Sequence, residues 1–268
     1  MKSGSIITSA QNPKIKSLLA LEKPRERKKQ QLFTIEGIKE IHMALQAGYR
    51  IGTVFYCDEL IKKEELQSLN VPDRLLVRVS KPVFDKIAMR ENSGGVIAVA
   101  EMKTHRLEQL TLSDNPLVLV LERVEKPGNL GAILRTADAA AVDAVIICDP
   151  QTDFYNPNVI RSSLGCVFIR QTAVATSEDA IRWLKEKNLR IYCTWLEASK
   201  AYTDVDFTVP CAIVMGTEAT GLSDLWIKNA HANVIIPMHG KVDSLNVSVS
   251  AAILVFEARR QRMVYARK

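Results

Sequence analysis

The feature that most constrains this fold is a regular alternation of short apolar runs with helical patterns, from Leu117 to the end of the chain. The apolar runs, which predict strands, are Leu117 to Leu121, Ala144 to Cys148, Phe168 to Ala173, Arg190 to Trp195, Cys211 to Met215 and Asn233 to Ile236. Strands that are apolar on both faces are typical of a parallel sheet covered by helices. We therefore predict an α/β domain over residues 116–268, closed by a long helix from Ser244 to Met263.

A second, smaller α/β domain is predicted over residues 1–105. Its strand patterns are Leu32 to Ile35, Ile51 to Cys57, Leu75 to Val79 and Val96 to Ala100, and its helical patterns are Ile38 to Ala47, Lys63 to Leu69 and Pro82 to Met89. The polar segment from Glu101 to Asn115 lacks periodicity and ends at Pro116, so we expect a linker over residues 106–115.

Composition narrows the class of protein. A chain of 268 residues, 47% apolar and 25% charged, can bury a substantial core and is neither disordered nor fibrous. Its apolar runs are far shorter than the roughly 20 residues that span a bilayer, and residues 1–9 lack a secretory hydrophobic region. The five scattered cysteines indicate reduced core thiols, and neither they nor the four histidines have metal-ligand spacing. We predict a cytoplasmic protein with no metal and no membrane contact.

Positive charge is concentrated in the N-terminal part. Residues 1–105 carry 18 Lys and Arg against 12 Asp and Glu, whereas residues 106–268 carry 18 of each. A basic region usually attracts a polyanion such as nucleic acid, although a generally solvated basic surface would give the same count. The densest stretch follows a short helical pattern that opens at Asn12-Pro13. The predicted RNA contacts here are Lys14, Lys16, Arg25, Arg27, Lys28 and Lys29.

Three segments that follow predicted strands carry the functional signal, because ligands of open α/β sheets bind at the carboxyl ends of strands. The first runs from Glu122 to Asp138. Pro127-Gly128 predicts a turn, and Asn129 is a good N-cap for a helix whose buried stripe is Leu130, Ile133, Leu134, Ala137 and Ala141. Arg135 points away from that stripe. On its own it could be a surface arginine paired with Asp138.

The second segment, Val214 to Ser223, nearly matches a phosphate-binding loop. Leu222 stands where that motif needs its lysine, which excludes a nucleotide triphosphatase of this type. Gly216 and Gly221 still permit a tight turn, with Glu218 at its edge. An ordinary turn between a strand and a helix is the alternative.

The third segment, Ile235 to Ser250, feeds the closing helix. We expect the buried stripe of that helix to be Leu245, Val249, Ala252, Ile253 and Phe256. Ser244 and Asn246 stand near its N-terminus, where free N–H groups and short polar side chains can hold an anion. Helix capping is the alternative for both residues.

Taken together and in this order, the three segments resemble the signature motifs of the SpoU, or TrmH-like, branch of the SPOUT methyltransferases. The matching residues are Asn129-Leu-Gly-Ala-Ile-x-Arg135-Thr, Gly216-x-Glu218-x-x-Gly221-Leu-Ser, and Ile236-Pro-Met-x-Gly with Ser244-Leu-Asn-Val-Ser. They span about residues 117–262. In addition, Phe33-Thr-Ile-Glu-Gly37 and the helical pattern after it are similar to the small substrate-binding domain, of a ribosomal-protein-like α/β type, that precedes the catalytic domain in many members.

The resemblance implies a catalytic domain with a trefoil knot near its C-terminus, which breaks the usual rule against threaded chains. It also implies a homodimer and S-adenosylmethionine as cofactor, bound in the knotted loops. By resemblance, the cofactor contacts come from Gly216, Ile236, Met238, Leu245 and Asn246.

The residues that the resemblance implies to be catalytic or to hold substrate are Asn129, Arg135, Glu218, Ser244 and Asn246. In the family the arginine is often proposed to take the proton from the 2′-hydroxyl. Because a guanidinium stays protonated near neutral pH, we instead expect Arg135 to stabilise the developing alkoxide and to orient the target phosphate. Ser244 and Asn246 would position the ribose.

This chain departs from the family pattern at two places. Lys126 stands before Pro-Gly-Asn, where the family usually has Asp, and Ala140-Ala141 follows the first helix, where the family often has Phe-Gly. We expect these changes to affect local geometry and substrate choice.

The predicted function is transfer of a methyl group from S-adenosylmethionine to the ribose 2′-hydroxyl of RNA. Ribosomal RNA is the expected substrate because members with this N-terminal domain often act on it, and transfer RNA is the alternative. A non-catalytic RNA-binding or ribosome-assembly factor is a different alternative, which the presence of Arg135, Glu218, Ser244 and Asn246 argues against. An oxidoreductase is disfavoured because no G-x-G-x-x-G follows a strand.

Overall fold

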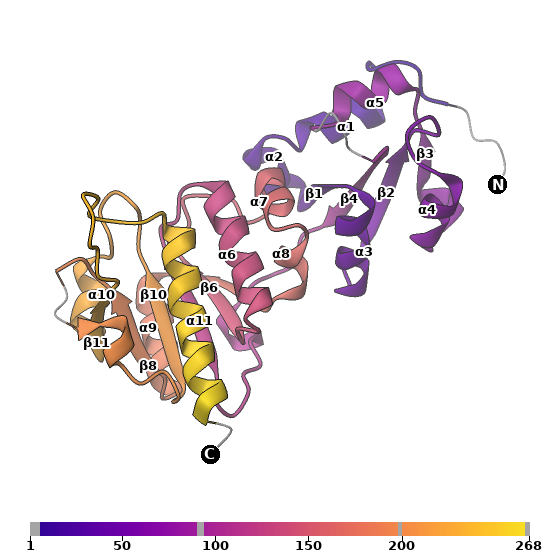
Figure 1. The fold of residues 1–268 in the computed structure, drawn as a ribbon. Coiled ribbons are helices and arrows are strands. Elements are labelled where there is room, and N and C mark those ends of the chain that lie inside the picture. The colour runs from indigo at the N-terminus through magenta and orange to yellow at the C-terminus, as the bar shows by residue number, and fades with distance from the viewer. Residues whose placement is uncertain (1–5, 90–93, 198–199, 266–268) are drawn as a thin grey trace. The chain divides into compact units, whose positions relative to one another are not determined.

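A computed structural model describes residues 6–89, 94–197 and 200–265, and the chain forms two compact units (Figure 1). Unit 1 comprises Met1–Thr104 and Asp153–Ile169, and unit 2 comprises His105–Thr152 and Arg170–Lys268. Residues 106–115, the expected linker, lie in unit 2, where Leu107 is buried in the core. Residues 153–169 interrupt the sequence of unit 2 and pack with unit 1 instead.

Unit 1 is a small α/β fold, as predicted. Its helices are α1 (Pro13–Ala20), α2 (Pro24–Gln30), α3 (Ile38–Gln46), α4 (Lys63–Ser68) and α5 (Lys81–Ile87), and its strands are β1 (Leu32–Glu36), β2 (Ile51–Tyr56), β3 (Leu76–Arg78) and β4 (Val96–Glu101). The strand order is β1-β4-β2-β3. β4 pairs antiparallel with β1 and β2, whereas β3 is parallel to β2.

Two short helices from the middle of the chain complete unit 1: α7 (Pro157–Ser162) and α8 (Cys166–Ile169). Aromatic rings hold them. Phe33 of β1 lies 4.3 Å from the ring of Tyr155, and Tyr49 lies 5.0 Å from the ring of Phe168. The strand predicted from Phe168 to Ala173 is therefore wrong in its first half, because Phe168 is helical and packs into this cluster. The strand itself, β7, begins at Thr172.

Arg27 corrects another prediction. Its side chain is only 1% exposed, its Nη2 lies 2.6 Å from Asp153 Oδ2, and its Nη1 donates to the carbonyls of Leu21 and Glu22. Burial without such partners would be very costly for a guanidinium. The predicted RNA contact of Arg27 is therefore wrong, since all of its contacts lie inside unit 1 and its side chain does not reach the surface.

Unit 2 is built on a seven-stranded parallel sheet of order β7-β6-β5-β10-β8-β11-β9. The strands are β5 (Leu117–Glu122), β6 (Ala144–Cys148), β7 (Thr172–Ala175), β8 (Arg190–Thr194), β9 (Lys200–Ala201), β10 (Cys211–Met215) and β11 (Ala232–Ile235), and the helices are α6 (Pro127–Ala139), α9 (Ser177–Glu186), α10 (Asp224–Asn229) and α11 (Val247–Tyr265). Short 3₁₀ turns lie at Asp73–Leu75, Leu107–Gln109 and Tyr202–Asp204. β5, β6 and β10 are fully buried, as their apolar sequences predicted.

α6, which carries Asn129 and Arg135, packs against α11 (Figure 1). The buried stripe of α6 includes the predicted Leu130, Ile133, Leu134 and Ala137, but the prediction of Ala141 is wrong, because this residue follows the helix and is exposed. The predicted stripe of α11 is wrong in phase, because its buried residues are Val247, Ala251, Leu254, Val255 and Ala258. Val249 and Phe256 are instead 47% and 49% exposed, so α11 has a second apolar face.

Four of the five cysteines are buried and all are free thiols, as predicted. Burial raises the pKa of the Cys211 thiol to about 11. Within the described ranges, no helix is long and apolar enough to cross a membrane.

Candidate active site

The three segments singled out in the sequence follow β5, β10 and β11, whose carboxyl ends lie at one edge of the parallel sheet. β5 and β10 are direct neighbours, and β8 separates β10 from β11. This edge is where an open parallel sheet usually binds its ligand.

The first loop leads directly into α6. The helix begins at Pro127 with Lys126 as its N-cap residue, so the prediction that Asn129 caps the helix is wrong. The proline fixes the first helical residue and moves the start three positions earlier. Asn129 consequently lies in the first turn, where its side chain is released from capping and reaches across to the second loop.

The second loop makes the tight turn that its glycines predicted. The backbones of Thr217 and Gly221 hydrogen-bond to each other in both directions, at 3.0 and 3.1 Å. Gly221 has φ +67°, and a Cβ on Gly216 would lie 2.3 Å from the backbone of Gly221. Glycine is therefore needed at both ends of the turn.

A buried carboxylate fixes this second loop to β5. Glu122, at the end of β5, is 1% exposed and accepts a hydrogen bond of 2.8 Å from the backbone N–H of Ser223. Glu122 was not among the predicted functional residues. Its signal in the sequence is a single carboxylate at the end of an otherwise apolar run.

The third loop ends at Asn246, the residue directly before α11. Its Oδ1 accepts from the backbone N–H of Ser248 at 3.0 Å and from the Ser248 hydroxyl at 2.6 Å, as a helix cap does. The capping interpretation is thus confirmed for Asn246. Because capping occupies only Oδ1, Nδ2 remains available to donate elsewhere.

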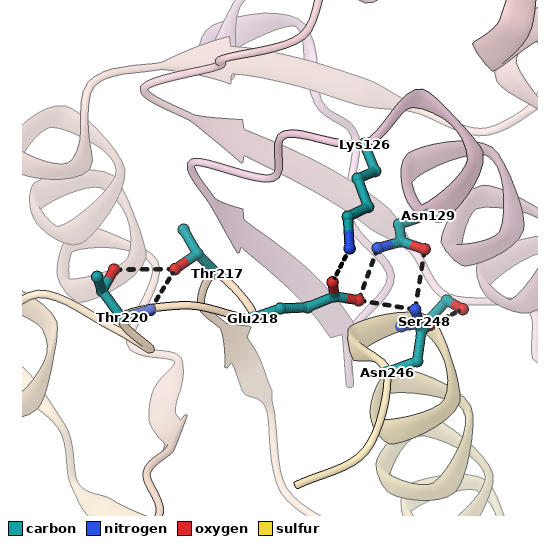
Figure 2. Close-up of polar contacts among 7 residues, drawn as sticks. All are labelled: Lys126, Asn129, Thr217, Glu218, Thr220, Asn246 and Ser248. Atoms are coloured by element: carbon teal, nitrogen blue, oxygen red, sulfur yellow. Dashed lines mark hydrogen bonds and ion pairs between the residues drawn. The ribbon is translucent and has the colours of Figure 1, made fainter.

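Figure 2 shows that the three loops meet at the carboxylate of Glu218. Glu218 Oε1 accepts from Asn129 Nδ2 at 2.9 Å and from Asn246 Nδ2 at 2.7 Å. Asn246 Nδ2 also donates to Asn129 Oδ1 at 3.1 Å, and Lys126 donates to Glu218 Oε2. Direct hydrogen bonds between residues as much as 117 positions apart therefore join the three loops in one polar network.

The charges of the network are coupled. The hydrogen bond from Lys126 lowers the pKa of Glu218, against a smaller opposing effect of desolvation, and the bond from Asn129 lowers it further. Glu218 in turn raises the pKa of Lys126. Both groups are therefore charged near neutral pH, so Lys126 has no free amine to accept a proton and Glu218 is a weaker base than an isolated carboxylate.

A cavity of about 320 Å³ lies beside this network, a size within the usual range of roughly 300–1,000 Å³ for small-molecule sites. Six of the predicted residues line it: Gly216, Glu218, Ile236, Met238, Ser244 and Leu245. Asn246 does not line it, although its neighbours Leu245 and Val247 do. Trp195 and Met215 also line the cavity and were not predicted, although both stand at the carboxyl ends of predicted strands.

The cavity fits the cofactor implied by the sequence resemblance. Its walls combine apolar side chains, such as Ile236 and Met238, with the backbone of the turn at Gly216. Glu197 and Asp243 add carboxylates that could attract the positive groups of S-adenosylmethionine. Among the described residues, no group of three or more His, Cys, Asp or Glu could hold a metal ion.

Two predicted catalytic residues stand apart from the polar network. Arg135 is exposed on α6, and Asp138, its expected partner, instead pairs with Arg170 at 3.0 Å. Ser244 lines the cavity and donates to Asp243 at 3.1 Å. In unit 1, the predicted RNA contacts other than Arg27 are all exposed: Lys14, Lys16, Arg25, Lys28 and Lys29.

Comparison with protein families divides the chain into the same N-terminal and C-terminal parts, except that the C-terminal match includes residues 153–169 of unit 1. Residues 116–256 match the SpoU rRNA Methylase family, and residues 12–98 match the MRM3-like substrate binding domain. The first match contains every residue of the polar network, and the second lies within unit 1.

Individual relatives cover different parts of the chain. The 23S rRNA (guanosine(2553)-2′-O)-methyltransferase RlmP of Bacillus subtilis is 30% identical, over 94% of this chain and 98% of its own length. A crystal structure of an AdoMet-bound rRNA methyltransferase from Sinorhizobium meliloti is 31% identical with a TM-score of 0.88, covering 96% of this chain and 97% of its own. The tRNA (guanosine(18)-2′-O)-methyltransferase of Thermus thermophilus is 38% identical, but over 61% of this chain and 84% of its own length.

Proposed function

Because this chain belongs to the SpoU rRNA Methylase family, we infer that it is an S-adenosylmethionine-dependent RNA 2′-O-methyltransferase, and we propose that its substrate is ribosomal RNA. The observation that carries the proposal is the meeting of Asn129, Glu218 and Asn246 in one hydrogen-bonded network beside a cofactor-sized cavity. Three motifs distant in sequence thus supply one site.

When bound, S-adenosylmethionine supplies an electrophilic methyl group on a positively charged sulfur. Gly216, Ile236, Met238 and Leu245 would hold the cofactor, and transfer of its methyl group to the ribose 2′-oxygen would leave a neutral thioether and release the hydroxyl proton to water. The residues of this chain must therefore align the oxygen with the methyl group and stabilise its growing negative charge.

We assign those tasks to the predicted residues. Arg135 stabilises the developing alkoxide and orients the target phosphate, because its guanidinium presents a planar fork of donors and stays charged. Ser244 and Asn246 position the ribose. Asn129 and Glu218 hold the Asn246 amide in a fixed orientation through bonds of 2.7 to 3.1 Å.

Ribosomal RNA is favoured over transfer RNA by the N-terminal part of the chain. The B. subtilis relative, named as acting on 23S rRNA, aligns over 94% of this chain, whereas the T. thermophilus relative, named as acting on tRNA, aligns over 61%. We propose that residues 1–105 bind the RNA through the exposed Lys14, Lys16, Arg25, Lys28 and Lys29. Since ribosomal RNA is the substrate, the proposed compartment is the cytoplasm.

We also propose that the protein is a homodimer and, from the family resemblance, that unit 2 is knotted near its C-terminus. Val249, Phe256 and Met263 are spaced by seven residues on α11 and are 47%, 49% and 58% exposed. An apolar stripe with this spacing is typical of a helix that packs against another helix. Phe256→Asp should give a monomer in light scattering, whereas Leu60→Asp, at an exposed apolar residue of unit 1, should leave the dimer intact.

The proposed function is tested by methyl transfer from labelled S-adenosylmethionine to purified ribosomal RNA and transfer RNA in parallel. We expect label in ribosomal RNA, located on a ribose by its resistance to alkaline cleavage. Label in transfer RNA alone would overturn the choice of substrate. Cofactor binding without any transfer would favour the non-catalytic RNA-binding factor.

A further inference from the structure

Lys126 occupies a position in the site that the predicted catalytic set does not explain. It is the N-cap residue of α6, yet its side chain makes no capping bond and extends to Glu218 instead (Figure 2). A lysine that contributes only to solubility usually extends into solvent, whereas Lys126 contacts the carboxylate at which the three loops meet.

The contacts divide the Glu218 carboxylate into two halves. Oε2 binds the ammonium of Lys126, and Oε1 accepts from the amides of Asn129 and Asn246 at 2.9 and 2.7 Å. If Oε2 lost its partner, the carboxylate could rotate about its last torsion, which is intrinsically broad. Rotation would remove the common acceptor of both amides.

The other end of the network is already fixed. Asn246 Oδ1 is committed to the backbone N–H and the hydroxyl of Ser248 at the start of α11. The orientation of the Asn246 amide is therefore set by α11 on one side and by Glu218 on the other. From the N-terminal end of α6, Lys126 holds Oε2 of Glu218, while Asn129 binds only Oε1.

We propose that Lys126 is a positioning residue for methyl transfer, which holds the Glu218 carboxylate so that Asn129 and Asn246 keep the orientation needed to align the ribose. The inference rests on the proposed function, because it assigns the network to the methyl-transfer step. Lys126 itself need not touch the substrate.

The energetics favour a catalytic effect over an effect on stability. The side chains of Lys126 and Glu218 are 67% and 28% exposed, and exposed ion pairs contribute little to folding. Small displacements of positioned groups, in contrast, can reduce turnover strongly. A Lys126 variant should therefore fold normally and turn over slowly.

The pair also predicts a change in pH dependence. Lys126 lowers the pKa of Glu218, so the ionised carboxylate, and the activity that needs it, is lost only at low pH. Without Lys126 this pKa rises, and activity should begin to fall at a higher pH. Glu125 is the other charged group acting on the pair: it raises the pKa of Lys126, and it is unchanged in the variants.

The test compares Lys126→Gln, Lys126→Arg and the wild type in steady-state methyl transfer from pH 8 down to the lowest pH at which the wild type stays folded. We expect Lys126→Gln to lower kcat about tenfold, with KM for S-adenosylmethionine little changed, and to shift the acid limb of the kcat profile upward. Lys126→Arg should restore most of the loss. Lys228→Gln, an exposed lysine of α10 that pairs with Asp224, is the matched control.

Carbon-detected NMR titration of Glu218 in the wild type and Lys126→Gln gives a readout that needs no RNA. A higher carboxyl pKa in the variant supports the inference. An active wild type with an unchanged kcat and pH profile in Lys126→Gln would overturn it, as would a loss that Lys126→Arg does not restore. If the wild type binds cofactor but methylates no RNA, the proposed function fails instead, and the assignment of Lys126 to methyl transfer fails with it.

Discussion

The predicted functional residues of the two units differ in how the fold arranges them. In unit 2, Asn129, Glu218 and Asn246 come from separate motifs and hydrogen-bond to one another. In unit 1, Arg27 and Lys28 are adjacent in one basic stretch, yet Arg27 is buried against Asp153 and Lys28 is exposed. A count of charges thus predicts which part of the chain has a basic surface. The position of each residue around its helix decides whether its side chain is exposed on that surface.

The largest effect expected from this contrast is on stability. Arg27→Ala should destabilise unit 1 by about 3–5 kcal/mol, because it leaves Asp153 and two backbone carbonyls without their buried partner. Arg25→Ala, on the exposed face of the same helix, should change the free energy of unfolding by no more than about 0.5 kcal/mol. Urea denaturation of both variants checks this, and equal effects would show that burial does not separate the two arginines.

The next effect is on turnover in unit 2. Arg135→Lys keeps the charge but loses the planar fork, so we expect kcat to fall by about 10²-fold, near the lower end for loss of an oxyanion-hole donor. Arg182→Lys, at an exposed arginine of α9, is the control. Single-turnover rates with saturating cofactor measure the step directly. Near-wild-type turnover in Arg135→Lys would argue against both tasks assigned to Arg135.

The basic surface of unit 1 should affect RNA binding and not chemistry. Replacing both Lys28 and Lys29 by Ala should raise KM for RNA about tenfold at low salt and reduce the salt slope of binding by about one per lost phosphate contact. Lys86→Ala, at an exposed lysine of α5, serves as the control. A fall in kcat with unchanged RNA affinity would place these lysines in the catalytic machinery and would remove the contrast between the units.

The fold was largely predictable because the strands of both sheets coincide with apolar runs in the sequence. β5, β6 and β10 coincide with predicted strands within a residue, since central parallel strands are apolar on both faces. The packing of residues 153–169 with unit 1 was not predictable. It depends on contacts such as Tyr155 with Phe33, between residues 122 positions apart, which periodicity does not encode.

The candidate site was predictable in its members but not in its contacts. The motifs named Asn129, Glu218 and Asn246, yet the sequence placed Asn129 at a helix cap and gave Lys126 no partner. The predicted buried stripe of α11 was wrong for a related reason. The helix is apolar on two faces, so periodicity could not tell which face packs against α6.

The smallest expected effect tests whether stability and activity are separable in unit 2. Ala141 follows α6 with φ +48°, and its N–H donates to Asp138 O while that of Val142 donates to Ala137 O, the hydrogen bonds of a glycine-type helix end. Relief of this left-handed strain should outweigh the added freedom of the unfolded chain, so Ala141→Gly should stabilise unit 2 by about 0.5 kcal/mol. Ala139→Gly, two residues earlier and still helical, should destabilise it by about 0.5–1 kcal/mol. Thermal unfolding and methyl transfer are measured on both variants. We expect opposite shifts in Tm and an unchanged kcat. A lower Tm for Ala141→Gly would show that the left-handed conformation of Ala141 is not strained enough for glycine to stabilise it.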